Sequence, residues 1–446
     1  MSSSKIRIVL LSPKGPLYKH KTGIFRKSLR VAPLTLTTLA ALIPPELEVD
    51  LRLIDEGVDD IPPDLEADLV GMTVITGSSP RCYELSREFR ARGIKVVLGG
   101  PHVTLVPEEA ALHADSIVTG YAEETWPQLL RDFSRGEMQA RYRMSPTFSL
   151  ETSGNHPFPK RELLPKSMYR TQNTFEATRG CIHACEFCVV PAAWGRKPFH
   201  KPVANVVEDI RRTGARKLVF YDLNLIADTQ YAKDLFTALI PLKINWFGLS
   251  TTFINRDPEL LDLTAKSGCM GLLVGFESVN RASLASVRKG FNKPDDYPAF
   301  IRELHGRGIA LMGTFVFGSD GDTPQSFAEV VDFVQEHKID LPRYSVMTPF
   351  PGTPLHDRLA SAGRILTRDW SLYDGQHVVF KPNHMSAGQL QDGHEWAWKK
   401  TYSMGHVGSR MMRKMPNWPL LMTANLGYRF YANNLSRFYT CQGGLI

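Results

Sequence analysis

Short apolar runs alternate with amphipathic segments along the first 142 residues. Continuous apolar runs predict buried strands, and apolar positions repeating every three or four residues predict the helices between them. The predicted strands are KIRIVLLSP, EVDLRLID, ADLVGMTVIT, KVVLGG and SIVTGY. Strands that are apolar on both faces indicate a parallel sheet covered by helices on each side. We therefore expect a doubly wound, Rossmann-like α/β domain over residues 1–142, with its ligand site at the carboxyl ends of the strands.

The same alternation returns between residues 174 and 360. Six apolar runs, separated by helical patterns, predict strands here: TFEATR, KLVFYD, INWFGLSTT, GLLVGFES, ALMGTFVFG and RYSVMTPF. Six βα units fit a partial (β/α)6 barrel, because a full barrel of eight units needs more chain. In such a barrel the chemistry lies on the loops that follow the strands.

Two further segments complete the predicted organisation. Residues 143–173 are rich in Pro, Ser, Asn and Lys, which indicates a linker. Residues 361–446 are mainly helical in pattern and dense in aromatic and Met residues. The chain therefore divides into an α/β domain, a linker, a partial barrel and a helical C-terminal region.

The composition indicates a globular protein of a reducing compartment. The hydrophobic share is 43% and the charged share 22%, as in ordinary globular domains. No apolar run approaches the roughly 18 residues that a membrane span needs. The six cysteines in 446 residues are too few for a disulfide framework. We expect a cytoplasmic protein whose clustered cysteines serve metal binding or catalysis.

The net charge of +7 belongs to the C-terminal region. No acidic residue follows Glu395, whereas seven basic residues do: Lys399, Lys400, Arg410, Arg413, Lys414, Arg429 and Arg437. The remaining Lys and Arg residues equal the 46 Asp and Glu residues in number. Three interpretations stay open: a solvated helical surface, a site for an acidic substrate, or a peripheral membrane contact, since aromatic residues lie among the cations.

Three cysteines lie within eight positions, in the stretch ATRGCIHACEFCVV. Cys181, Cys185 and Cys188 follow a C-x3-C-x2-C spacing directly after the first predicted barrel strand. A structural zinc ion needs four protein ligands, and His183 or His200 is a candidate for the fourth. An iron–sulfur cluster on three thiolates leaves one iron open to a substrate. The missing fourth cysteine favours the open cluster over zinc.

This motif, with an aromatic residue before its last cysteine, resembles that of the radical S-adenosylmethionine enzymes. The resemblance implies a [4Fe–4S] cluster on Cys181, Cys185 and Cys188. It also implies that the open iron chelates S-adenosylmethionine, whose cleavage by one electron yields a 5′-deoxyadenosyl radical. An external electron donor of the flavodoxin or ferredoxin type is then required.

Other segments resemble the family's S-adenosylmethionine contacts. FYDLN resembles the segment at the methionine end, GFES the ribose contact, and FVFGSDGDT and TPFPGTPL the segments against adenine. The family's commoner form has a second acid where FYDLN has Leu223. For each single residue, capping the next helix is an alternative role. The resemblance implies contacts from Asp222, Asn224, Ser250, Glu277, Ser278, Gly318 and Pro349.

The first domain resembles the cobalamin-binding domain of cobalamin-dependent radical S-adenosylmethionine enzymes. It lacks the D-x-H-x-x-G motif whose histidine ligates cobalt in many cobalamin proteins. A degenerate domain that binds no cobalamin is therefore an alternative. The small and polar residues at its strand ends are the implied cobalamin contacts: Thr76, Gly77, Ser78, Gly99, Gly100, His102, Gly120 and Tyr121.

The two resemblances together imply cobalamin-dependent C-methylation of an unactivated sp³ carbon. The expected substrate is a large apolar compound, such as a secondary metabolite, or an acidic small molecule. A non-methylating oxidative cyclisation or rearrangement is the alternative in the same family. A zinc-stabilised nucleic-acid-binding module is the alternative from another class, although we expect no nucleic-acid partner.

Overall fold

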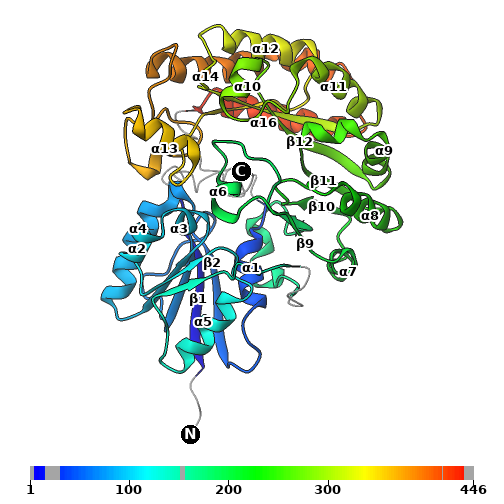
Figure 1. Cartoon of the computed structure of the whole chain (residues 1–446). Helices are drawn as coiled ribbons and strands as arrows, with labels where there is room; N and C mark the ends of the chain where they lie inside the picture. Colours follow the sequence, from blue (N-terminus) through cyan, green and yellow to red (C-terminus); the bar gives the residue numbers. More distant parts are fainter. Residues whose placement is uncertain (1–4, 16–30, 151–155, 414, 436–446) are drawn as a thin grey trace.

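The computed structural model describes residues 5–15, 31–150, 156–413 and 415–435. It shows two α/β halves stacked end to end, with the N-terminal half drawn in blue and cyan at the bottom of Figure 1. The barrel half, in green and yellow, lies above it, and the C-terminal helices cover the upper half. The cysteine loop lies between the two halves.

The N-terminal sheet is six-stranded and parallel, in the order β2-β1-β3-β4-β5-β6. Its strands are β1 (Ile6–Ser12), β2 (Val49–Asp55), β3 (Leu69–Thr73), β4 (Lys95–Gly99), β5 (Ser116–Thr119) and β6 (Arg141–Arg143). The helices of this half are α1 (Leu34–Ala41), α2 (Ser79–Ala91), α3 (Pro101–Leu105), α4 (Pro107–Ala111) and α5 (Thr125–Ser134).

The two faces of this sheet bury separate cores. Ile8 and Leu10 of β1 face one core, whereas Val9 and Leu11 face the other. A strand alternates its side chains between faces, so an unbroken apolar run requires cover on both sides. The predicted doubly wound domain is therefore confirmed. The sixth strand, β6, was missed because Arg-Tyr-Arg carries no apolar run.

The barrel sheet is also parallel and six-stranded, in the order β14-β13-β12-β11-β10-β7. Its strands are β7 (Thr174–Phe175), β10 (Lys217–Phe220), β11 (Asn245–Ser250), β12 (Cys269–Glu277), β13 (Ala310–Phe317) and β14 (Arg343–Val346). Its helices are α6 (Val189–Trp194), α7 (Val203–Thr213), α8 (Thr229–Leu239), α9 (Pro258–Lys266), α10 (Arg281–Ser286), α11 (Tyr297–Gly306), α12 (Ser326–Glu336) and α13 (Pro354–Ser361). The predicted partial barrel is confirmed.

The first predicted barrel strand is shorter than its sequence indicates. TFEATR was expected to form one strand, but the chain leaves the sheet after β7 and forms β8 (Thr178–Arg179). β8 pairs antiparallel with β9 (Phe199–His200) on the far side of the cysteine loop. The cysteine loop is therefore closed at its base by a two-stranded ribbon.

The C-terminal helices share the barrel's core. They are α14 (Ala387–Thr401), α15 (Met404–Met411) and α16 (Trp418–Ala432). Trp398 and Tyr402 are fully buried in the same cluster as the barrel strands, and the Trp398 indole donates to the Tyr344 carbonyl at 3.1 Å. Among the described residues, no helix is long and apolar enough to cross a membrane.

Gly268, which precedes β12, tests how tightly the barrel is packed. Its φ is +93°, and an added Cβ would lie 1.9 Å from the Ile244 carbonyl oxygen. We expect Gly268→Ala to lower the free energy of unfolding by about 3 kcal/mol or more, through backbone strain and overpacking. Gly214→Ala is the matched control, because its φ is +62° with nothing within 4 Å, and about 1 kcal/mol is expected. Equal losses in urea unfolding would contradict this prediction.

Candidate functional site

The cysteine loop brings three free thiols together between the two halves. Cys185 is 8% exposed, and its carbonyl accepts from the Cys188 amide at 3.2 Å. Burial, with a smaller effect from the neighbouring thiols, raises the pKa of Cys188 to about 12. Burial raises the pKa of Cys185 as well, so these two thiols need a strongly positive group to become thiolates. A metal centre supplies that charge, so the loop fits the iron–sulfur cluster.

Lys289 lies against these thiols. It was not identified from the sequence as a site residue. It is 7% exposed, and its ammonium donates to the Glu277 carboxylate. Its pKa is lowered by burial and raised more by Glu277, Cys185 and Cys188, so it stays cationic. A buried cation of this kind compensates thiolate and carboxylate charge. Its sequence context, RKGFNKP, looks like a solvated turn, so only the tertiary structure reveals its position.

The two histidines considered as zinc ligands are committed to aromatic stacks. His183 stacks on Phe291 and also contacts Phe253, with ring centroids 4.0 and 5.1 Å away. His200 stacks on Tyr231 at 4.5 Å. Within the described ranges, no three His, Cys, Asp or Glu side chains are grouped to hold a single metal ion.

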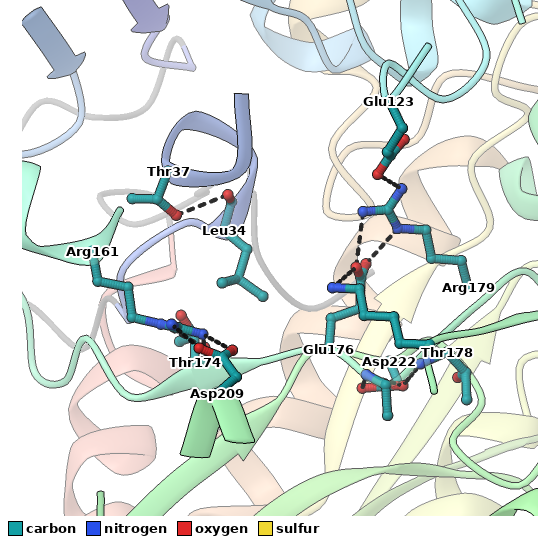
Figure 2. Close-up of polar contacts among 12 residues, drawn as sticks. Leu34, Thr37, Glu123, Arg161, Thr174, Glu176, Thr178, Arg179, Asp209 and Asp222 are labelled. Atoms are coloured by element: carbon teal, nitrogen blue, oxygen red, sulfur yellow. Dashed lines mark hydrogen bonds and ion pairs between the residues drawn. The ribbon is translucent and has the colours of Figure 1, made fainter. Parts of the chain in front are cut away.

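Asp222 and Asn224 follow β10 and lie at the base of the cysteine loop. Both carboxylate oxygens of Asp222 accept from the Ala177 amide, at 3.0 and 3.2 Å, and one also accepts from the Thr178 amide (Figure 2). Asp222 thus braces the backbone that leads into the loop, and a direct contact with S-adenosylmethionine stays a prediction.

Asn224, in the loop after β10, has a polar side-chain atom that is available to a ligand. Its amide nitrogen lies 3.6 Å from the Cys181 sulfur. Its side-chain oxygen is buried and has no hydrogen-bond partner among the described residues. An unpaired buried acceptor is costly unless a ligand satisfies it. Asn224 therefore fits the predicted contact with S-adenosylmethionine.

Glu277 ends β12 in a conformation that an L-residue rarely adopts. Its φ is +64°, at a break in the register with β13. This backbone turn directs its carboxylate toward Lys289, beside the thiols. Strain of this kind is retained where surrounding structure requires it, often at functional sites. The Glu277 carboxylate is already paired with Lys289, and its contact with the ribose stays a prediction.

The other predicted S-adenosylmethionine residues have local roles as well. The Ser278 hydroxyl accepts from the Asn280 amide at 3.0 Å, and the Ser250 hydroxyl donates to the Thr251 carbonyl at 3.2 Å. Gly318 has φ +103°, and a Cβ there would meet Leu390 at 2.8 Å, so C-terminal packing already requires the glycine. Pro349 is buried beside it in the loop after β14. Their contacts with the nucleotide stay predictions.

The predicted cobalamin residues lie at the strand ends that face the barrel half. Gly99, Gly100 and Gly120 are half-buried at the ends of β4 and β5. A Cβ on Gly100 would lie 2.9 Å from backbone atoms of Val74, and one on Gly120 would lie 2.6 Å from Met144. Packing inside the N-terminal half therefore already requires glycine at these two positions, and their contacts with cobalamin stay predictions.

Other members of this predicted set are occupied within the protein. His102 is fully buried, and its ring lies 3.2 Å from the Thr76 hydroxyl and 3.1 Å from the Tyr83 hydroxyl. Gly77 and Ser78 are buried in the same short 3₁₀ turn as Thr76. Tyr121 stacks on Trp194 of α6, with centroids 5.6 Å apart. Cobalamin contacts from these five residues stay predictions.

An ion network joins the halves beside the cysteine loop. Arg179 pairs with Glu123 of the N-terminal half and with Glu176 of the barrel (Figure 2). Its guanidinium also lies 5.0 Å over the Tyr121 ring. Arg179 and Lys201 lower the pKa of buried Glu176 to about 2, against the effect of burial. This network fixes the N-terminal half two residues before Cys181.

A second ion network holds the far side of the loop. Glu186, between Cys185 and Phe187, is buried and accepts from the Arg358 guanidinium of α13 at 2.9 and 3.1 Å. The Glu186 carbonyl accepts from the Leu355 amide, and the Glu186 amide donates to the Val287 carbonyl, both at 3.1 Å. The loop is therefore clamped to the segment after β14.

Asp222 gives this site a pH-dependent stability. Burial and, to a smaller extent, the Glu176 charge raise its pKa to about 7, although hydrogen bonds from Thr178 and Ala177 oppose the shift. Because the folded carboxyl keeps its proton more tightly than the unfolded one, its stabilising contribution is full below about pH 4 and is lost as the pH rises toward 7.

We expect Asp222→Asn to remove part of this slope, up to about 1.4 kcal/mol per pH unit, because the amide does not titrate. Urea unfolding of the iron-free protein between about pH 4 and 8 measures it. Asp228→Asn is the control, since Asp228 caps α8 and asparagine caps equally well. Parallel pH profiles for wild type and Asp222→Asn would contradict the assignment.

Comparisons with known proteins agree with this geometry. The family model of the Radical SAM superfamily matches residues 175–334, and the B12 binding domain model matches residues 32–130. The two matches coincide with the two α/β halves. The zinc-stabilised nucleic-acid-binding alternative has no support in either.

Two curated relatives from Chlorobaculum tepidum cover most of the chain. Bacteriochlorophyllide d C-12(1)-methyltransferase is 31% identical, over 83% of this chain and 82% of the relative. Bacteriochlorophyllide d C-8(2)-methyltransferase is 30% identical, over 78% of this chain and 80% of the relative.

A solved structure shows the same fold. It is the radical S-adenosylmethionine methyltransferase TsrM from Kitasatospora setae with cobalamin and a [4Fe–4S] cluster bound, with TM-score 0.64 and 19% identity. The match covers 80% of this chain and 75% of that one. This chain belongs to the radical S-adenosylmethionine superfamily, among the cobalamin-dependent methyltransferases that carry a B12 binding domain before the radical domain.

Proposed function

We propose that this protein transfers a methyl group to an unactivated sp³ carbon of a large, mainly apolar substrate. The observation that carries the proposal is the position of the three-thiol loop. It lies against the buried cation Lys289 of the barrel half, and its neighbours Arg179 and Trp194 contact Glu123 and Tyr121 of the B12 binding domain. This position supports cofactor sites on both sides of the boundary between the two halves.

The cofactors supply the radical and methyl-transfer chemistry when bound, and the protein supplies binding, positioning and shielding. Cys181, Cys185 and Cys188 hold the cluster, and Lys289 balances their charge. Asn224 and Glu277 offer polar groups to the nucleotide. The clamps at Arg179 and Glu186 fix the loop between the two halves, so that the reacting groups stay aligned.

Aromatic side chains around the loop favour a dry reaction space. Phe253, Phe291 and His183 contact one another in one cluster, and Trp194 stacks on Tyr121 at the domain boundary. The Trp194 indole nitrogen is buried without a hydrogen-bond partner among the described residues. Excluding water protects a reactive radical from quenching. A large apolar substrate, as bacteriochlorophyllide d is for the two curated relatives, suits such walls.

Label transfer tests the proposed reaction directly. Reconstituted protein receives bacteriochlorophyllide d, trideuteriomethyl-labelled S-adenosylmethionine and a chemical reductant. We expect a product carrying one trideuteriomethyl group, with 5′-deoxyadenosine and S-adenosylhomocysteine formed in equal amounts. Formation of 5′-deoxyadenosine with an unlabelled, altered product would instead indicate cyclisation or rearrangement.

Matched cysteine variants serve as controls. Cys181→Ala should lose the bound iron and lower labelled product by more than about 100-fold. Cys269→Ala removes a buried thiol of β12 outside the site. This variant should keep both the bound iron and the formation of labelled product. Corrin absorbance retained by Cys181→Ala would show that the N-terminal half still binds cobalamin.

We also propose that the C-terminal helices touch an anionic membrane surface. Along α16, Trp418, Leu420, Leu426 and Phe430 are exposed, and the exposed cations Lys399 and Lys400 end α14. Arg410 does not contribute to this membrane-facing surface. The interpretation of the basic region as a surface patch therefore does not hold for this residue. It is 2% exposed and donates to the Thr401 carbonyl and the Asn425 side chain. Lys414 and Arg437 lie outside the described residues.

Vesicle sedimentation tests this contact. Wild-type protein should sediment with vesicles containing phosphatidylserine, and Leu426→Asp/Phe430→Asp should reduce the bound fraction by at least about tenfold. Thr423→Asp/Asn433→Asp changes two exposed polar positions of the same helix region by the same charge and should have a smaller effect. Equal binding by all three proteins would contradict the contact.

A further inference from the structure

The segment between α13 and α14 forms a surface loop that starts and ends at the barrel half. Its two ends are joined by an isolated bridge between Ile365 and Phe380. Its middle is tied to the barrel, because the Val346 amide of β14 donates to the Gly375 carbonyl at 2.7 Å. A compact surface loop with joined ends is an Ω-loop, a form that is often functional. We define residues 365–380 as the strap.

The tip of the strap touches the B12 binding domain. It is the short 3₁₀ helix η8 (Trp370–Leu372), which packs against the turn at Thr76–Ser78 and against α2. The Trp370 indole donates to both carboxylate oxygens of Glu109, at 3.0 and 3.1 Å. Its ring also lies edge-on to the buried His102 ring, with centroids 6.0 Å apart. The boundary between the halves thus has a second contact, besides the ion network at Arg179.

Glu109 is held as a carboxylate at this contact. Burial raises the pKa of its carboxyl, but hydrogen bonds from His102, Tyr83 and Trp370 outweigh burial and hold the pKa below its usual value. The Tyr83 hydroxyl donates at 2.9 Å, and a His102 ring nitrogen lies 3.4 Å away. Both residues belong to the same half as Glu109, so their contacts remain when Trp370 is released. Release of Trp370 therefore leaves no unpaired buried charge.

The Trp370 contact separates more easily than the ion network does. The side chains of Arg179 and Glu123 are 14% and 5% exposed, so pulling them apart leaves buried charges unpaired. The side chain of Glu109 is 34% exposed, so water can take the place of the indole. The boundary thus has one strong contact beside the cysteine loop and one weaker contact at the strap.

The strap lies over the edge of the domain where a ligand is expected. The turn at Thr76–Ser78 follows β3, and His102 lies in α3, directly after β4. In a doubly wound domain, ligands bind outside the carboxyl ends of the strands. Another part of this edge is covered by α6, where Trp194 stacks on Tyr121. The barrel half therefore covers this edge at two places.

We propose that release of Trp370 from Glu109 opens the boundary between the halves and lets cobalamin reach and leave this edge. The inference rests on the proposed function only in requiring that the B12 binding domain takes up cobalamin. Only noncovalent contacts change in this step. The contact is closed before and after passage, so it slows entry and exit by the same factor and leaves the affinity unchanged.

The test measures uptake and release of cobalt-labelled hydroxocobalamin by the full-length, iron-reconstituted protein. Uptake starts from cobalamin-free protein, and release is followed during a chase with excess unlabelled cobalamin. We expect Trp370→Phe to raise both rates at least about tenfold, as for loss of a hydrogen bond to a charged group, with the Kd within about threefold of wild type. The iron content should match the wild type.

Two further variants make the comparison specific. Trp418→Phe is the matched control, because that indole is 36% exposed and donates at 2.8 Å to the Met411 carbonyl among the C-terminal helices. Both of its rates should stay within about twofold of wild type. Glu109→Gln keeps an acceptor for the indole but removes the charge, so both rates should rise less than in Trp370→Phe. If Trp370→Phe disturbs the fold of the strap, Glu109→Gln provides the measurement.

Four results would overturn the proposal. One is unchanged rates in Trp370→Phe. Another is faster release with unchanged uptake, which would show a weaker binding site and no control of passage. The third is equal acceleration by Trp418→Phe, and the fourth is a wild-type protein that takes up no cobalamin. Absence of methyl transfer in a protein that shows the expected rates would contradict the proposed function and leave the role of Trp370 intact.

Discussion

The buried guanidinium of Arg179 is the contact on which the arrangement of the two halves depends. It pairs with Glu123 from one half and Glu176 from the other, two residues before the first cysteine of the loop. Removing one partner of a buried ion pair leaves an uncompensated charge, which is strongly destabilising. The relative position of the two halves is thus fixed beside the cysteine loop.

The cysteine loop contains little regular secondary structure. Contacts at its start and at its centre hold it in place. Asp222 accepts the amides that lead into it, and Glu186 ties its centre to Arg358 of α13. α13 begins at Pro354, within the TPFPGTPL segment that is expected to lie against adenine. The centre of the cysteine loop and the segment after β14 are therefore held together by one set of contacts.

The C-terminal region completes the barrel and is not an appendage. Trp398 and Tyr402 lie in the barrel's own hydrophobic cluster, and Gly318 has no side chain because Leu390 and Phe380 pack against it. A six-stranded open barrel leaves the sheet edge at β14 exposed, and α14 covers that edge. The same helices then present the apolar outer face of α16, so one region serves both stability and the proposed surface contact.

The sequence by itself determined the two α/β halves, the order of their strands along the chain and the three cysteines. Each of these depends on local signals: apolar runs for strands buried on both faces, and a spacing that only a metal site explains. Only the tertiary structure decided which polar residues face the site. Lys289 came from a turn that looked solvated, whereas Asp222, His102 and Tyr121 were taken up by contacts inside the protein. Some roles depend on a distant partner and leave no local pattern in the sequence. The pairing of β6 and the ion pair of Glu186 with Arg358 are examples, because the residues that stabilise them lie far away in the chain.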